Sequence, residues 1–229
     1  MRPLFVVLRV AVAVAITVAI IAQLSESLGF WRESGITDPT IQVVNFFSFF
    51  TIESNIASAV VLVIGAVQLI MRSRPDSAGY TLARASVTTY MVVTGLVYNL
   101  LLRGIELPQG STVGWSNEIL HVVAPVYLLV DWLFAPGRSA IAARTIWFVL
   151  VYPIVWVGYT LIRGPFVTDA IFGNDFWYPY PFLNPVTSAD GYLSVAIYVV
   201  VIAAAIALVA AAVLWVSRRG QTAESRLTR

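Results

Sequence analysis

The chain has 229 residues, of which 59% are hydrophobic and only 11% are charged. A soluble domain offers no core large enough for so many apolar side chains, so the composition excludes a soluble globular protein and predicts an integral helical membrane protein. Cysteine is absent, histidine occurs once and the formal net charge is +2. These counts exclude disulfides and thiolate metal sites and argue against a histidine-based zinc or haem site. We therefore expect no metal, no cofactor and no nucleic-acid partner.

A helix needs roughly 20 predominantly apolar residues to cross a bilayer. Six stretches meet this requirement, at about residues 4–24, 42–71, 85–102, 117–134, 145–163 and 193–216. Segments that contain charges, prolines and glycines connect them, and no internal repeat is evident. We therefore expect an all-α fold, in which residues 1–217 form one six-helix transmembrane domain and residues 218–229 form a cytoplasmic tail.

The arginines lie mostly on one side of this predicted bundle. If the N-terminus is inside, 11 of the 14 basic residues are cytoplasmic, namely Arg2, Arg9, Arg72, Arg74, Arg84, Arg138, Arg144, Arg218, Arg219, Arg226 and Arg229. The outer segments keep only Arg32, Arg103 and Arg163, and they collect the acidic residues Glu26, Glu33, Asp38, Glu106, Asp169, Asp175 and Asp190. The positive-inside rule then predicts a multi-pass protein of the cell membrane with both termini in the cytoplasm.

The second stretch contains "FFSFFTIESN", residues 46–55, an unusual density of polar groups for a membrane span. At about 100° per residue, one face of a helix would carry Asn45, Ser48, Thr51, Asn55 and Ser58. Polar groups in a span should face the bundle interior or a water-filled cavity. Ser48, Ser54 and Ser58 are also explained by simple helix packing, whereas Glu53 points away from Thr51 and should serve another contact.

The fourth stretch, "WSNEILHVVAPVYLLVDWLF", carries the only histidine, His121. Thr51 and His121 lie at comparable depths from the outer side, so contact between them is sterically possible if the two spans are neighbours. A lone histidine can equally hydrogen-bond a neighbouring helix. Pro125 should free a backbone carbonyl one turn above it. Asp131 lies near the cytoplasmic side, where we expect it to be solvated or paired with Arg138 or Arg144.

Three residues are alternatives for orienting the His121 ring: Glu118, Asn117 and Asn55. In the fifth stretch, Tyr152 lies too deep for an interfacial aromatic belt and needs a hydrogen-bond partner, which suggests that it lines the same cavity. The segment "DFWYPYPFLNP" that follows is rich in aromatic residues and proline. It should cover the outer mouth of the bundle, either as an aromatic belt or as a lid over a pocket.

Three motifs in this order resemble a known family: "FFSFFTIESN", "LHVVAPVYLLVDW", and "YPIVWVGYTLIRG" with "YPYPFLNP". They are similar to the androgen-induced-gene and androgen-dependent-TFPI-regulator superfamily, including its short bacterial members, over roughly residues 40 to 200. The resemblance implies an intramembrane hydrolase that cleaves fatty acid esters of hydroxy fatty acids, with Thr51 and His121 as its catalytic residues. It assigns no role to Asn55, Tyr152 or Tyr180. We treat these as candidate substrate-binding or supporting residues, together with Ser48, Ser54, Asn117 and Glu118.

The favoured hypothesis is that the Thr51 hydroxyl attacks a lipid ester and that His121 removes its proton. Asn55 or Ser54 would stabilise the oxyanion. An acyltransferase would use the same residues, with a lipid alcohol in place of water. The alternative class is non-catalytic: a transporter, a lipid-binding protein or a membrane scaffold, in which these polar groups serve proton relay or packing. An intramembrane serine protease is disfavoured because its Gly-x-Ser-Gly context is absent.

Overall fold

The computed structural model describes residues 2–71, 75–105 and 110–227, with side chains described up to residue 219. Its α-helices are α1 (Arg2–Glu33), α2 (Thr40–Phe47), α3 (Phe50–Met71), α4 (Ala78–Val97), α5 (Gly114–Glu118), α6 (Ala124–Phe134), α7 (Ile146–Arg163) and α8 (Tyr192–Leu227). Short helical turns are η1 (Tyr98–Leu102), η2 (Ile119–Val123), η3 (Ala143–Thr145), η4 (Gly164–Phe166) and η5 (Pro181–Leu183). Over these described ranges, one isolated bridge between Asp169 and Asn174 is the only β-type pairing.

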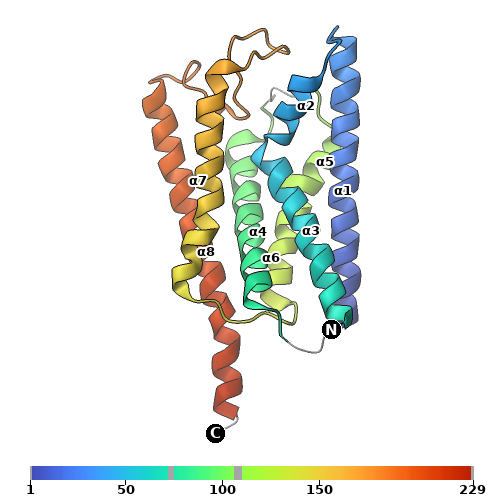
Figure 1. Ribbon diagram of the computed structural model, residues 1–229, viewed down its shortest axis with the longest axis vertical. Coiled ribbons are helices and arrows are strands. Elements are labelled where there is room, and N and C mark those ends of the chain that lie inside the picture. Colours follow the sequence, from blue (N-terminus) through green and yellow to red (C-terminus); the bar gives the residue numbers. More distant parts are fainter. Residues whose placement is uncertain (1, 72–74, 106–109, 228–229) are drawn as a thin grey trace.

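Within the described residues, six helical stretches are long and apolar enough to cross a membrane: Arg2–Glu33, Phe50–Met71, Ala78–Leu102, Gly114–Phe134, Ala143–Phe166 and Tyr192–Arg219. This confirms the predicted all-helical fold with six helices of membrane-spanning length and apolarity. Figure 1 shows the helices standing side by side, with both ends of the chain at the same end of the bundle and α8 projecting beyond it. Of the charged residues used for the predicted orientation, Arg72, Arg74, Glu106 and Arg229 lie outside the described residues, as does the side chain of Arg226.

The second predicted stretch, 42–71, is not one continuous helix. A turn at Ser48 and Phe49 separates α2 from α3. The Ser48 hydroxyl donates to the Val44 carbonyl at 2.7 Å, and the Trp156 indole donates to the Ser48 carbonyl at 3.1 Å. Because a side chain of α7 binds the Ser48 carbonyl, a contact from another helix stabilises the break between α2 and α3. Its consequence is that Thr51 lies in the first turn of a new helix.

The central helix of the bundle is α4, which contacts α3, α6, α7 and α8. On one side α3 packs against α1, and on the other α7 packs against α8, as Figure 1 shows. Large apolar side chains on the outer faces of α1 and α7, such as Val7 and Ile162, are exposed. This is the pattern that a lipid-facing surface requires. The candidate site lies between the α1–α3 pair and the α7–α8 pair.

Two π-helical turns face each other where α4 and α6 meet. η1 continues α4, and η2 lies between α5 and α6 and contains His121. A Cβ added to Gly95 would lie 3.1 Å from the Pro125 Cβ and 3.2 Å from the His121 carbonyl oxygen, so any larger residue here would require its neighbours to shift by a few tenths of an ångström. Pro125 has no N–H to offer the His121 carbonyl, as the sequence predicted. π-Turns inside α-helices often occur at functional sites.

A buried ion cluster joins three helices at the end of the bundle near the chain termini. Asp131 of α6 is 1% exposed, and its carboxylate accepts from Arg9 Nε of α1 at 2.8 Å and Arg84 Nε of α4 at 2.9 Å. The expectation that Asp131 is solvated or paired with Arg138 or Arg144 is therefore wrong. Arg138 instead donates to the Trp132 carbonyl. A charge buried inside a membrane bundle needs such partners, because the hydrocarbon chains of the bilayer cannot solvate it.

Candidate active site

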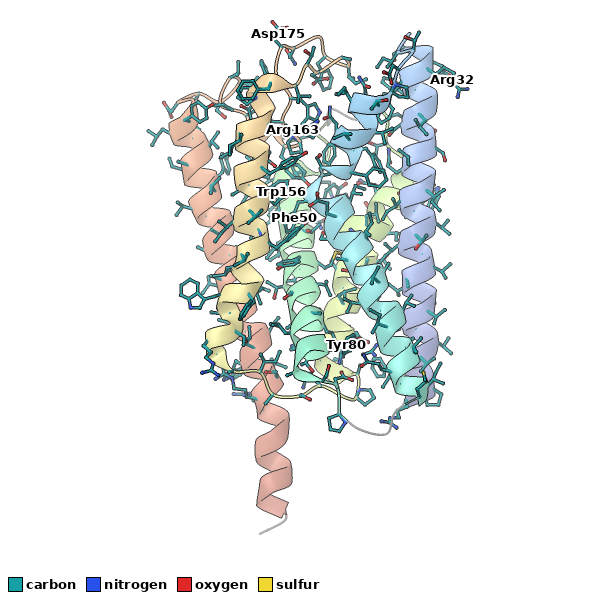
Figure 2. The ribbon with its side chains drawn as sticks, in the orientation of Figure 1. Arg32, Phe50, Tyr80, Trp156, Arg163 and Asp175 are labelled. Atoms are coloured by element: carbon teal, nitrogen blue, oxygen red, sulfur yellow. The ribbon has the colours of Figure 1, made fainter. Side chains whose placement is uncertain are left out.

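A cavity of about 180 Å³ lies between α4, α7, α8, η5 and the first turn of α3. Its walls are mostly aliphatic and aromatic, and the polar side chains among them are Thr51, Thr94, Tyr98, Trp156 and Tyr180. Figure 2 shows Phe50 and Trp156 in the space between α3 and α7, where their rings meet edge to face at 5.2 Å. The cavity suits an apolar ligand that carries a small polar group.

The cavity is bounded on one side by residues that also form the outer surface of the bundle. Ile154 of α7 lines the cavity and is 61% exposed, and Ala203 of α8 lines it and is exposed as well. In a span, an exposed aliphatic side chain faces the acyl chains of the bilayer. At Ile154 and Ala203, a single layer of side chains therefore separates the cavity from the outer surface of the bundle.

Thr51 reaches this cavity from the first turn of α3. The phenolic oxygen of Tyr180 accepts a hydrogen bond from the Thr51 N–H at 3.2 Å and shares a second one with Thr51 Oγ1, also at 3.2 Å. Burial raises the pKa of Tyr180 to about 12, so the phenol is neutral at physiological pH. Tyr180 thus holds the threonine hydroxyl in place and can donate a hydrogen bond to it.

The aromatic segment that carries Tyr180 is folded into the bundle. Trp177, Tyr178, Tyr180 and Leu183 are buried. The ring of Phe49 meets those of Trp177 and Tyr180 edge to face, at 5.7 and 5.6 Å. Of the two interpretations of this segment, the geometry is that of a lid, because Tyr180, Phe182 and Leu183 form part of the cavity wall.

His121 lies behind the cavity wall, stacked on Tyr98 with 4.0 Å between ring centroids. Its Nδ1 is 2.9 Å from the Asn117 carbonyl oxygen. A carbonyl oxygen only accepts, so Nδ1 carries the proton and Nε2 of the neutral ring carries the free lone pair. The Asn117 side chain donates to the Tyr98 hydroxyl, and Tyr98 itself lines the cavity. Asn117 therefore positions His121 through its backbone carbonyl and Tyr98 through its side chain.

Of the three candidates for orienting His121, the structure selects Asn117, through its backbone carbonyl. The Glu118 carboxylate instead pairs with Arg103 at 2.7 Å on a half-exposed surface, so its proposed role is corrected. Asn55 donates to the carbonyls of Thr51 at 2.9 Å and Leu120 at 3.2 Å. It therefore ties the first turn of α3 to the residue next to His121.

Thr51 and His121 are brought to neighbouring elements but are not hydrogen-bonded to each other. The Thr51 hydroxyl bonds to Tyr180, and Nδ1 of His121 bonds to Asn117. The link between the two residues runs through Asn55, which bonds to both chain segments. A proton moving from Thr51 to Nε2 of His121 therefore needs a bridging group such as water.

The remaining predicted residues serve other contacts. Ser54 donates to the Thr51 carbonyl at 3.2 Å, so its hydrogen, like those of Asn55, is already engaged and neither residue is a free oxyanion donor. Ser48 bonds to Val44 and to the Tyr159 hydroxyl. Tyr152 is not part of the cavity wall; its hydroxyl donates to Glu53, which explains why that carboxylate points away from Thr51.

Sequence reasoning missed two residues of the cavity wall, Thr94 and Tyr98. Both lie in the third span. Its stretch "VVTGLVYN" contains a threonine, a tyrosine and an asparagine within an otherwise apolar run, and this pattern could have identified them. The chain was also compared with known proteins: no family model, no curated protein and no solved structure matches it. The resemblance to a hydrolase superfamily therefore stands on three short motifs, and the geometry of the site carries the functional argument.

Proposed function

We propose that the chain is an intramembrane hydrolase of fatty-acyl esters, such as fatty acid esters of hydroxy fatty acids, that enter from the bilayer. The observation that carries this proposal is the position of the Thr51 hydroxyl. It lies in the wall of an apolar cavity bordered by lipid-facing residues, and it is hydrogen-bonded to a buried, neutral tyrosine.

In the first step, Thr51 Oγ1 attacks the ester carbonyl carbon while its proton passes, through one bridging water, to Nε2 of His121. The tetrahedral intermediate collapses, the ester C–O bond breaks and the leaving alkoxide takes the proton from His121. In the second step, water attacks the acyl–Thr51 ester, again with His121 as base. The fatty acid leaves and Thr51 regains its proton.

Tyr180 keeps the nucleophile oriented in this scheme. Its oxygen accepts from the Thr51 N–H, and its O–H can donate a hydrogen bond to Thr51 Oγ1. The hydrogen of the Thr51 hydroxyl is then free for the path to the base. In the same proposal, the arginine distribution places both termini in the cytoplasm and the cavity in the outer half of the cell membrane.

The test uses purified protein, a fluorophosphonate probe and a chromogenic long-chain ester. Thr51→Ala and His121→Ala should lose labelling and turnover by at least about 10³-fold, because nucleophile and base act as a unit. The matched control is Thr89→Ala, since Thr89 is also buried but donates to its own helix, at the Ala85 carbonyl. Equal labelling of wild type and Thr51→Ala ends the nucleophile assignment.

A non-catalytic lipid-binding protein is the second candidate, favoured by the absence of a direct bond between Thr51 and His121. Such a protein would bind a fatty acid in the same cavity and release it unchanged. Quenching of tryptophan fluorescence by a brominated fatty acid, with no ester turnover in wild type, would support this candidate over the hydrolase. Transfer of the acyl group to an added alcohol would identify an acyltransferase that uses the same residues.

A further inference from the structure

Thr94 lines the cavity and is only 6% exposed, and its hydroxyl has no hydrogen-bond partner. Three other hydroxyls on α4 donate to the carbonyl four residues earlier, those of Thr81, Ser86 and Thr89, at 3.0, 3.0 and 2.9 Å, whereas the Thr88 hydroxyl, like that of Thr94, has no partner. Thr94 does not use this common arrangement. A buried hydroxyl without a partner carries a desolvation penalty, so a ligand that accepts its hydrogen bond would gain that energy.

Thr94 is well placed relative to the proposed reacting groups. It lies one turn before Tyr98 on the same face of the helix, and Tyr98 is the ring on which His121 stacks. Thr51 and Tyr180 line the same cavity. The two residues first expected to stabilise an oxyanion, Ser54 and Asn55, already donate to backbone carbonyls. Among the polar side chains that line the cavity, Thr94 is the one whose hydroxyl makes no hydrogen bond, while the Tyr98 hydroxyl accepts from Asn117 and keeps its own hydrogen.

We propose that the Thr94 hydroxyl donates a hydrogen bond to the carbonyl oxygen of an acyl lipid bound in the cavity. This binding role does not depend on catalysis. A second role rests on the proposed hydrolase function: Thr94 also donates to the oxyanion that forms when Thr51 attacks the same carbonyl carbon. Thr94→Val tests both, because it replaces the hydroxyl with a methyl group of similar shape.

The chain offers a matched control in Thr88. It lies on the same helix, is fully buried and also has an unpartnered hydroxyl, but it does not line the cavity. Thr88→Val therefore removes the same group from the same kind of environment without touching the ligand. Thr94→Ser restores the hydroxyl with a smaller side chain. Thermal unfolding of each variant checks that the fold is kept.

The binding arm compares a long-chain methyl ketone with the n-alkane of equal length, each displacing a fluorescent fatty acid. Wild type and Thr88→Val should bind the ketone about five-fold more tightly than the alkane, the factor expected for one neutral hydrogen bond. Thr94→Val should lose this preference and Thr94→Ser should keep it. A preference that persists in Thr94→Val, or that is absent from wild type, overturns the proposal.

The turnover arm separates this inference from the proposed function. With a long-chain ester, Thr94→Val should lower kcat by about 10²- to 10³-fold with little change in KM, as removal of an oxyanion donor does elsewhere. Full activity of Thr94→Val beside an inactive Thr51→Ala would reject the oxyanion role and leave the hydrolase intact. Loss of the ketone preference in Thr94→Val, in a protein that hydrolyses no ester, would keep the carbonyl site and reject the hydrolase.

Discussion

The buried ion cluster allows a quantitative test of what holds the bundle together. Asp131 accepts from Arg9 Nε and Nη2 at 2.8 and 3.1 Å and from Arg84 Nε at 2.9 Å. Asp131→Asn removes the negative charge but keeps the shape. It leaves two buried guanidinium groups, and among the described side chains Asp76, 3.4 Å from Arg84, is the only other carboxylate that forms an ion pair with either of them.

Removing one partner of a buried ion pair costs about 3–5 kcal/mol, because the remaining charge is left uncompensated. For a chain of this size that corresponds to a decrease in Tm of roughly 6–20 °C. The assay is thermal unfolding in detergent micelles followed by tryptophan fluorescence. The control is Arg103→Gln, which breaks the half-exposed pair with Glu118 and should shift Tm far less than Asp131→Asn does, because solvent screens an exposed ion pair.

A double variant sharpens this test. If Arg9 and Asp131 act as a pair, Arg9→Gln combined with Asp131→Asn should cost less than the sum of the single changes, by about 0.5–3 kcal/mol. An effect of Asp131→Asn as small as that of Arg103→Gln, or strict additivity in the double variant, would refute the view that these charges join α1, α4 and α6.

Three further predictions follow from single contacts. Tyr180→Phe removes both bonds to Thr51 and should lower kcat by about 10²-fold; turnover within a factor of two of wild type would contradict the orienting role. Gly95→Ala should lower the free energy of unfolding by about 1–3 kcal/mol, because its Cβ would press on Pro125. The Cβ of Gly158→Ala meets nothing within 4 Å, so this control should not destabilise the fold. Equal Tm values for the two variants would count against close approach at Gly95. Burial raises the pKa of the Asp76 carboxyl above 3.8. The stability that this group contributes is therefore present below that pH and is lost as the pH rises through the folded-state pKa. Asp76→Asn should flatten this part of the Tm–pH profile, and an unchanged profile would exclude Asp76 as its source.

The spans were predictable from hydropathy because each needs a long apolar run, but their ends were not. α1 continues nine residues past the predicted end at residue 24, to Glu33. Gln23 and Glu26 bond to residues 111 and 113 of a distant segment. The break at Ser48 also lacks a local signal, since neither proline nor glycine occurs there and a tryptophan more than 100 residues later holds it.

The candidate site was predictable to the extent that it depends on helix periodicity. Periodicity placed Thr51 on an inward face and His121 at a matching depth, and the structure puts them on neighbouring elements. It does not reveal the partners, because these come from other elements: Tyr180 is 129 positions from Thr51. The same limit explains the error at Asp131. Arg138 and Arg144 are near in sequence, but the carboxylate is bound by Arg9, 122 positions away.

The π-turn at η2 has a consequence for how the two ends of the fourth span are linked. A π-turn holds one more residue than an α-turn, so it offsets the angular register of everything that follows by about 100°. His121 lies inside that turn and Asp131 lies after it. Deleting a single residue from 119–123 would therefore leave a smoother helix that cannot present the imidazole to Tyr98 and the carboxylate to Arg9 at the same time.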